Sequence, residues 1–168
     1  MSFKQATPWY LLALVIIVID QITKAWADSN LMFNQIEVTS FFNLTLAYNK
    51  GAAFSFLHDA GGWQRWLFSG LSLAVSVALT VWISRLSKQE RLLSLALSLV
   101  LAGALGNLYD RVVLGHVIDF LDFHWDGKHF PAFNIADSAI TVGAILLAWE
   151  SLFAKKPESD PKGNVVNE

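Results

Sequence analysis

The sequence contains no cysteine, and this absence excludes several kinds of chemistry at once. Without cysteine the chain can form no disulfide, bind no metal through thiolates and use no thiol nucleophile. An excess of charge of one sign is also missing, because 12 Lys and Arg residues face 14 Asp and Glu residues, for a net charge of −2. Since nucleic-acid binding needs a basic surface, we expect no nucleic-acid partner.

Several catalytic signatures are missing as well. The sequence has no His-Glu-x-x-His zinc pattern, no Gly-x-Ser-x-Gly elbow for serine hydrolysis and no glycine-rich phosphate loop. His116, His124 and His129 share one segment with Asp122, but without the spacing of a zinc-binding helix. We therefore predict that the protein uses no metal and no cofactor.

Apolar residues are abundant, at 54% of the 168 residues. Four stretches, 9–26, 66–83, 92–109 and 135–153, approach the roughly 20 helical residues that cross a bilayer core of about 30 Å. The second and third contain no Asp, Glu, Lys, Arg or His, whereas the first and fourth each contain two such residues. The sequence predicts a mainly α-helical membrane protein with four transmembrane helices.

The first stretch has an alternative interpretation as a cleaved signal peptide. Lys4 precedes its apolar run, and Ala25, Trp26 and Ala27 resemble a cleavage site with small residues. Asp20 and Lys24 would then lie between the apolar run and the cut, which is unusual for such a peptide. We therefore favour a retained helix.

Lys and Arg in the short connections predict the orientation. They gather before the first span, between the second and third, and after the fourth, so both termini are expected in the cytoplasm. These cations are Lys4, Arg85, Lys88, Arg91, Lys155, Lys156 and Lys162. The segments 27–65 and 110–134 should then lie on the outer face of the membrane.

The first outer segment has the composition of β-structure. Residues 35–38 and 41–48 are rich in β-branched and aromatic residues, and residues 49–51 form a turn before the apolar stretch 52–57. We expect a small β-hairpin or sheet over about 34–57 and a loop between the third and fourth helices. Residues 1–154 should form one domain, followed by a disordered cytoplasmic tail, 155–168.

Polar residues within the spans require a reason, because a charge at midspan costs about 2.5–3.5 kcal/mol on insertion scales. Asp20 and Lys24 are four residues apart on one helix face, so they either form an internal ion pair or serve the function. Gly103, Asn107 and Arg111 form one stripe of the third helix. For Asn107 and Arg111 we favour a functional role.

Two other features of the third helix complete this pattern. Ala102 and Gly106 form a small-xxx-small pair, so we expect Gly103 and Gly106 to serve close helix packing. Asp110 is expected to face away from the polar stripe.

Two aspartates stand in contrasting surroundings near the outer face. Asp119 lies among bulky apolar residues, where burial would raise its pKa. Asp137 opens the fourth helix as the N3 residue behind a possible N-cap, Asn134, and a helix N-terminus favours the ionised form. Such a pair suits acid–base peptide hydrolysis, in which one group takes a proton and the other gives one.

The residues alone leave alternatives open for both positions. Asp137 is also explained as a simple cap, and Asp119 as a solvated loop residue. Spacing alone does not prefer Asp119 over Asp110, Asp122 or Asp126.

Five segments in order resemble the lipoprotein signal peptidases, or signal peptidase II, of bacterial cytoplasmic membranes. They are 20–24 (DQITK), 48–55 (YNKGAAFS), 103–111 (GALGNLYDR), 117–120 (VIDF) and 133–137 (FNIAD). Each segment is weak by itself, but the five together, in this order and spacing, cover nearly the whole chain apart from the tail.

The resemblance implies an aspartic endopeptidase of the bacterial inner membrane with Asp119 and Asp137 as its catalytic dyad. Its implied substrate-binding residues are Asn49, Gly51, Asn107, Arg111 and Asn134. Asp20 and Lys24 are characteristic positions to which the resemblance assigns no role. Its implied substrates are prolipoproteins with a diacylglyceryl-modified cysteine, cut on the amino side of that cysteine among membrane lipids.

Two other classes of function remain as alternatives. Intramembrane Asp, Lys and Arg also occur in proton-coupled transporters, although repeat symmetry and interrupted helices are not evident here. A membrane scaffold would use Gly103, Gly106 and the polar pairs only for packing, and changes at Asp119 and Asp137 would then affect stability more than activity.

Within the dyad we expect Asp119 to hold the proton and Asp137 to be the charged partner.

Overall fold

The computed structural model describes residues 3–51 and 61–153. Four helices span these residues: α1 (Phe3–Asn30), α2 (Trp63–Arg85), α3 (Arg91–Val113) and α4 (Ile135–Phe153). Each is long and apolar enough to cross a membrane, which confirms the four predicted helices. The first three extend past their predicted bounds, because hydropathy marks the apolar part of a helix, whereas backbone hydrogen bonds continue into polar residues.

The tail predicted to be disordered, 155–168, lies outside the described residues. The alternative cleavage site at Ala25, Trp26 and Ala27 lies within α1. Ala27 is fully buried beside Leu31 and Phe120, so this part of α1 belongs to the folded core.

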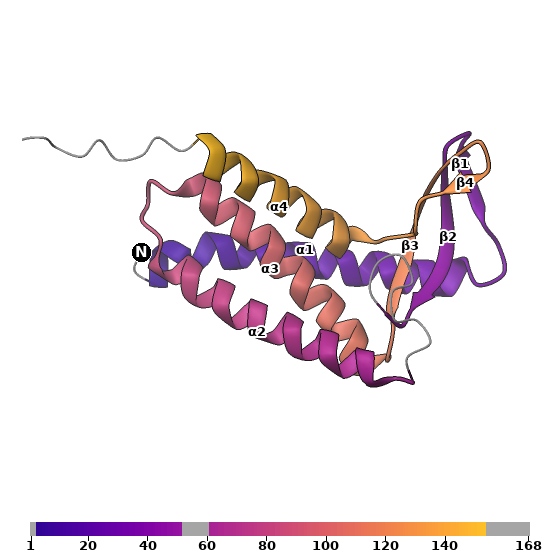
Figure 1. The fold of residues 1–168 in the computed structure, drawn as a ribbon, viewed down its shortest axis with the longest axis horizontal. Helices are drawn as coiled ribbons and strands as arrows, with labels where there is room; N and C mark the ends of the chain where they lie inside the picture. Colours follow the sequence, from indigo (N-terminus) through magenta and orange to yellow (C-terminus); the bar gives the residue numbers. More distant parts are fainter. Residues whose placement is uncertain (1–2, 52–60, 154–168) are drawn as a thin grey trace, which may run out of the picture.

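A small antiparallel sheet lies beyond one end of the helix bundle, in the order β1-β2-β3-β4 (Figure 1). Strands β1 (Ile36–Thr39) and β2 (Phe42–Asn49) each begin one residue later than predicted. The β structure expected between the first two helices is therefore confirmed. The predicted stretch 52–57 lies outside the described residues.

The segment after α3, which we expected to be a loop, also contributes to this sheet. It forms β3 (Val117–Trp125) and β4 (Lys128–His129), and β3 pairs along most of β2. Residues 117–120 are buried on both faces, so the polar–apolar alternation that signals a strand is absent there. The turn at Asp126 and Gly127, with φ of 49° and 73°, is a hairpin signal that the prediction overlooked.

Helix α3 is central to the bundle and packs against α1, α2 and α4 (Figure 1). Leu97, Leu101 and Ala102 of α3 are buried in one apolar cluster with Ile83 of α2. The C-terminal part of α1 continues to the sheet, and α1 contacts β2 and β3. Residues far apart in the sequence therefore meet where the bundle and the sheet join.

The glycines of α3 allow close approach of neighbouring elements, as expected. A Cβ on Gly103 would collide with the backbone carbonyl oxygen of Ala136, so α4 lies directly on α3 there. A Cβ on Gly106 would lie 2.7 Å from Oδ2 of Asp20 and 3.3 Å from Cβ of Ala136. These positions bring α1 and the start of α4 against the same part of α3.

Candidate active site

Asp137 is held at the first turn of α4 by a reciprocal capping arrangement. The backbone N–H of Asp137 donates to Oδ1 of Asn134 at 2.9 Å, and the N–H of Asn134 donates to Oδ2 of Asp137 at 3.3 Å. Both residues thus satisfy N–H groups that the helix start leaves free. The N-cap and N3 positions predicted from the sequence are the observed ones.

Asp119 lies on β3, near the point where this strand passes the start of α4. Its side chain is only 2% exposed. Its Oδ1 accepts a hydrogen bond from Nδ2 of Asn134 at 2.7 Å, and its Oδ2 accepts one from Nδ2 of Asn49 at 3.1 Å. Asn134 therefore contacts both aspartates. Its side-chain Nδ2 donates to Asp119, and its backbone N–H and its side-chain Oδ1 form hydrogen bonds with Asp137.

Asn107 of α3 is the third asparagine in this cluster. Its Nδ2 donates to Oδ1 of Asp137 at 2.7 Å, and its Oδ1 accepts from Nδ2 of Asn134 at 3.2 Å. Asn49, Asn107 and Asn134, from β2, α3 and the start of α4, thus surround the two carboxylates with fixed amide donors. Such a network restricts each carboxylate to one orientation.

Burial raises the pKa of Asp119 to about 7, and the nearby charge of Asp137 adds to this effect. The amide donors Asn49 and Asn134 act in the opposite direction, since they stabilise the ionised form. Asp119 can therefore hold a proton close to neutral pH. This agrees with the expectation from its apolar neighbours in the sequence.

The two aspartates lie at the wall of a cavity of about 790 Å³. Its wall also includes Asn49, Asn107 and Arg111, together with apolar side chains of β3, the β4–α4 connection and α4. The apolar lining includes Val117, Phe130, Phe133, Ile140 and Val142. The cavity can thus accept a largely apolar ligand and present its polar part to the carboxylates.

Two of the expected substrate-binding residues lie behind this wall. Asn134 is fully buried and, among the described residues, is not part of the cavity lining. Gly51 is also buried, and its backbone N–H donates to Oδ1 of Asn49 at 3.0 Å. Neither Asn134 nor Gly51 faces the cavity. Their hydrogen bonds orient Asp119, Asp137 and Asn49.

Arg111 faces the cavity from the end of α3. Its guanidinium lies 5.6 Å from the ring centre of Phe68, and its Nη1 donates weakly to the carbonyl oxygen of Asn107 at 3.4 Å. The last turn of α3 is itself held by Arg65 of α2, which donates to the carbonyl oxygens of Arg111 and Val112 at 2.5 and 2.7 Å. Arg65 was not anticipated, because only the fold brings it to this helix end.

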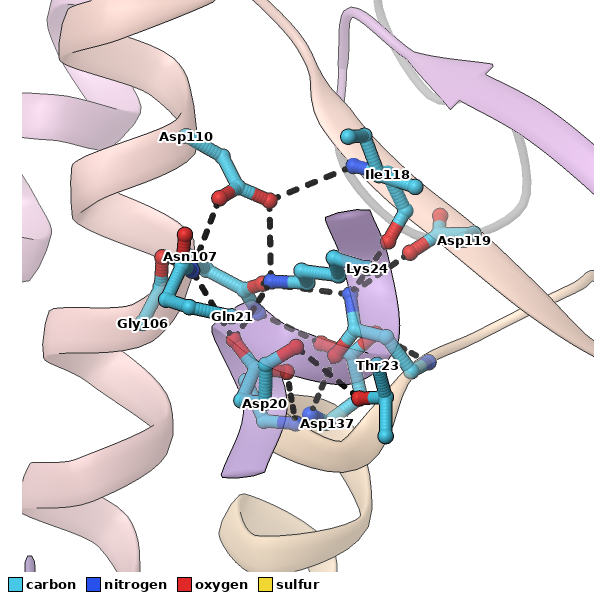
Figure 2. A network of polar contacts seen from close by, with 12 residues as sticks. Asp20, Gln21, Thr23, Lys24, Gly106, Asn107, Asp110, Ile118, Asp119 and Asp137 are labelled. Carbon is cyan, nitrogen blue, oxygen red and sulfur yellow. Dashed lines mark hydrogen bonds and ion pairs between the residues drawn. The ribbon is translucent and has the colours of Figure 1, made fainter. Parts of the chain in front are cut away.

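Asp20 and Lys24 form a buried ion pair next to this site, with Nζ 2.8 Å from Oδ2 of Asp20 (Figure 2). Asp110, which we expected to face away from the polar stripe, instead joins them, with its Oδ2 2.8 Å from the same ammonium. Asp110 lies three residues after Asn107, on a neighbouring part of the same helix face, and this spacing could have revealed it.

The remaining aspartates considered from the sequence lie elsewhere. Asp122 is bound to Asn43 and His129 on the sheet, and Asp126 is exposed in the β3–β4 turn. Asp119 of β3 and Asp137 at the start of α4 are thus the two carboxylates that share a network through Asn134.

Four helices able to cross a membrane, with two coupled carboxylates at a cavity near one end, define a polytopic membrane protein with a carboxylate-pair site. The family model of signal peptidase (SPase) II matches residues 12–153. The lipoprotein signal peptidase of Pseudomonas fluorescens is 56% identical over 95% of this chain and 93% of its own length. That of Teredinibacter turnerae is 57% identical over 90% of both chains.

Solved structures give the same result at the level of the fold. A bacterial membrane enzyme is 34% identical, with a TM-score of 0.77 over 90% of this chain and 94% of the other. A second bacterial membrane enzyme structure gives a TM-score of 0.76 at 33% identity. The chain belongs to the signal peptidase II family, which confirms the resemblance noted in the sequence.

Proposed function

We propose that this protein is an aspartic endopeptidase that removes signal peptides from diacylglyceryl-modified prolipoproteins, cutting on the amino side of the lipidated cysteine. Its membership of the signal peptidase II family supports the class of activity. The observation that carries the aspartic mechanism is the pair Asp119 and Asp137 at the cavity wall, which Asn134 joins from behind. In this proposal they are the catalytic residues.

The first step is the addition of water to the scissile carbonyl. Asp137 is the ionised partner, because both its oxygens accept N–H donors at a helix N-terminus. It removes a proton from water as the water oxygen bonds to the carbonyl carbon. Asp119, protonated near neutral pH, donates a hydrogen bond to the carbonyl oxygen and stabilises the charge that develops there.

The second step breaks the peptide bond. Asp119 gives its proton to the amide nitrogen of the lipidated cysteine as the C–N bond breaks, and Asp137 keeps the proton taken from water. This leaves a free amine on the lipoprotein and a carboxylate on the released signal peptide. The two carboxylates thus exchange roles within one cycle, and they titrate as a unit.

The other cavity residues have distinct proposed roles. Arg111 offers guanidinium donors to substrate carbonyl groups, and Asn49 and Asn107 combine contact with the cavity and orientation of the dyad. The apolar lining from Phe133 to Val142 accommodates the apolar segment of the substrate. A substrate held in the bilayer would enter this cavity from the side.

We place the sheet and the dyad on the outer face of the inner membrane, with both termini in the cytoplasm. The distribution of Lys and Arg in the connections supports this orientation. Proton-coupled transport, the alternative from the sequence, finds less support, since none of the four described helices is interrupted at midspan.

The test is cleavage of a diacylglyceryl-modified prolipoprotein beside its unmodified form, by purified protein in detergent or vesicles. The wild type should cut the modified form next to the cysteine and leave the unmodified form intact. Asp119→Asn and Asp137→Asn should each abolish cleavage while retaining the fold, as judged by thermal unfolding. Near-normal cleavage by either variant would disprove the dyad assignment, and proton uptake into vesicles without proteolysis would favour transport.

A further inference from the structure

A buried ammonium group lies directly behind the dyad (Figure 2). Lys24 of α1 is 1% exposed, and its Nζ contacts three oxygens: Oδ2 of Asp20 and Oδ2 of Asp110, both at 2.8 Å, and Oδ1 of Asn107 at 2.9 Å. The three N–H groups of the ammonium thus have three partners. Asp20 and Asp110 are both fully buried.

The two carboxylates of this ion cluster bind backbone groups beside the catalytic aspartates. Oδ1 of Asp20 accepts the N–H of Ala136 at 2.8 Å, and Oδ2 of Asp110 accepts the N–H of Ile118 at 3.3 Å. Ala136 directly precedes Asp137, and Ile118 directly precedes Asp119. One ion cluster therefore fixes the backbone next to each member of the dyad.

Gln21 makes the cluster rigid. Its Nε2 donates to Oδ1 of Asp110 at 2.9 Å and to Oδ2 of Asp20 at 3.1 Å, so it links the two carboxylates independently of Lys24. Every carboxylate oxygen of Asp20 and Asp110 consequently has a hydrogen-bond donor or the ammonium as a partner. Gly106 provides the space for Oδ2 of Asp20.

We propose that Asp20, Lys24 and Asp110 are positioning residues that set the placement of Asp119 relative to Asp137. This inference rests on the proposed function. The dyad is carried by different elements, β3 and α4, and the ion cluster connects both to α1 and α3. A buried ion cluster is no more stabilising than well-packed apolar residues of the same volume, so stability alone does not explain it. The need to place two reacting groups accurately does explain the ion cluster, because a shift of about 1 Å can lower a rate about a hundredfold.

The Lys24 ammonium also reaches the dyad through Asn107. Since Oδ1 of Asn107 accepts from Lys24 and Asn134, its Nδ2 is left to donate to Asp137. Lys24 thereby fixes which end of the Asn107 amide faces the catalytic carboxylate.

The first test compares three isosteric variants of buried aspartates. Asp20→Asn and Asp110→Asn each leave a balanced pair of one cation and one anion, and Asp122→Asn is the matched control because Asp122 is buried on β3 without contact with the dyad. We expect kcat to fall by about tenfold to a hundredfold in the first two, with KM within about twofold of wild type. The control should stay within about twofold. Wild-type kcat in Asp20→Asn and Asp110→Asn would overturn the proposal, even if their melting temperatures fall.

A charge-free variant separates placement from stability. In D20N/K24M/D110N the cluster keeps its shape without ions, so the folded protein should persist with a similar melting temperature. We expect its kcat to fall at least about tenfold, since two weaker amides replace the charge-assisted contacts. Wild-type kcat in this variant would contradict the proposal.

A pH profile gives a readout that a purely structural cluster would not change. The charged groups acting on Asp119 come from three helices: Asp137, Lys24 and Arg111. Burial is the main cause of the raised pKa of Asp119, and Lys24 opposes it. Lys24→Met should therefore move the alkaline limb of the kcat profile to higher pH, and an unmoved limb counts against the proposal.

Failure of this proposal is distinguishable from failure of the proposed function. If Asp119→Asn and Asp137→Asn are inactive while Asp20→Asn and Asp110→Asn have wild-type kcat, the positioning role is wrong and the dyad assignment stands. If Asp119→Asn or Asp137→Asn retains near-normal cleavage, the dyad assignment in the proposed function, on which this proposal rests, is wrong.

Discussion

Strand β3 carries two buried aspartates, Asp119 and Asp122, that have similar local surroundings and different partners. They are 2% and 5% exposed, and each accepts a hydrogen bond from an asparagine of β2, at 3.1 Å from Asn49 and 3.4 Å from Asn43. Asp119 then meets Asn134, the charge of Asp137 and a large cavity. Asp122 meets Nδ1 of His129 at 2.9 Å.

The comparison shows that burial and strand position do not define a reactive carboxylate. The ring of His129 forms a hydrogen bond with Asp122, whereas a second carboxylate beside Asp119 raises the pKa of Asp119 and favours its protonated form. Because residues three apart on a strand point to opposite faces, the two aspartates meet different elements. The elements that pack on each face of β3 therefore determine whether its aspartate makes a structural contact or is available for chemistry.

The largest effect should come from replacing Asp119, and not Asp122, with asparagine. Asp119→Asn should lower kcat/KM by about 10³-fold or more, because it removes a proton donor from the dyad, and Asp137→Asn should do the same. Asp122→Asn should remain within about twofold of wild type. The measurement is cleavage of the lipidated substrate at matched amounts of folded protein, and comparable losses at Asp119 and Asp122 would remove the distinction between them.

A smaller loss is expected when the link between the two aspartates of the proposed dyad is removed. Asn134→Ala removes the amide donor of Asp119 and the acceptor for the N–H of Asp137, so kcat should fall by about a hundredfold. Asn43→Ala, which removes the matching contact of Asp122, should leave kcat within about twofold. An Asn134→Ala enzyme with normal kcat would show that the network does not position the dyad.

The sequence predicted the four helices and the cap at the start of α4, both from local signals. The helices follow from long apolar stretches, which are local signals, and the cap at Asn134 and Asp137 follows from a local pattern. The choice of Asp119 over Asp122 came from the family resemblance, since hydropathy describes both as polar residues in one apolar segment.

Contacts between distant segments were the part that could not be predicted. Strand β3 forms only because β2, some seventy residues earlier, offers an edge to pair with, and its apolar start carries no alternation. Asp110 joins Lys24 from another helix, so its role depends on how α1 packs on α3. The asparagines around the dyad likewise come from three separate elements.

The pH dependence of kcat gives a further test of the contrast between Asp119 and Asp122, with a smaller expected effect. The folded-state pKa of Asp119 is raised to about 7, above its ordinary value of 3.8. Activity that needs the proton of Asp119 should be lost as the pH rises through about 7. The measurement is kcat against pH with the lipidated substrate.

Asn49→Ala tests whether that limb belongs to Asp119. The Asn49 amide stabilises the ionised form of Asp119, so its removal should move the limb to higher pH. Asn43→Ala is the matched control and should leave the limb in place. A limb that moves equally in both variants would assign it to another group.

The smallest effect should be on stability, at the Asp122 end of the strand. His129 is 52% exposed and belongs to the two-residue strand β4, so its contact with Asp122 is largely screened by solvent. His129→Ala should lower the melting temperature by no more than about 2–4 °C, as expected for a loss of about 1 kcal/mol in a chain of this size. Tryptophan fluorescence during heating in detergent measures this change, with activity assayed on the same sample. A loss of activity of tenfold or more at unchanged melting temperature would mean that the Asp122 region takes part in the reaction, and the contrast between Asp119 and Asp122 would then have to be abandoned.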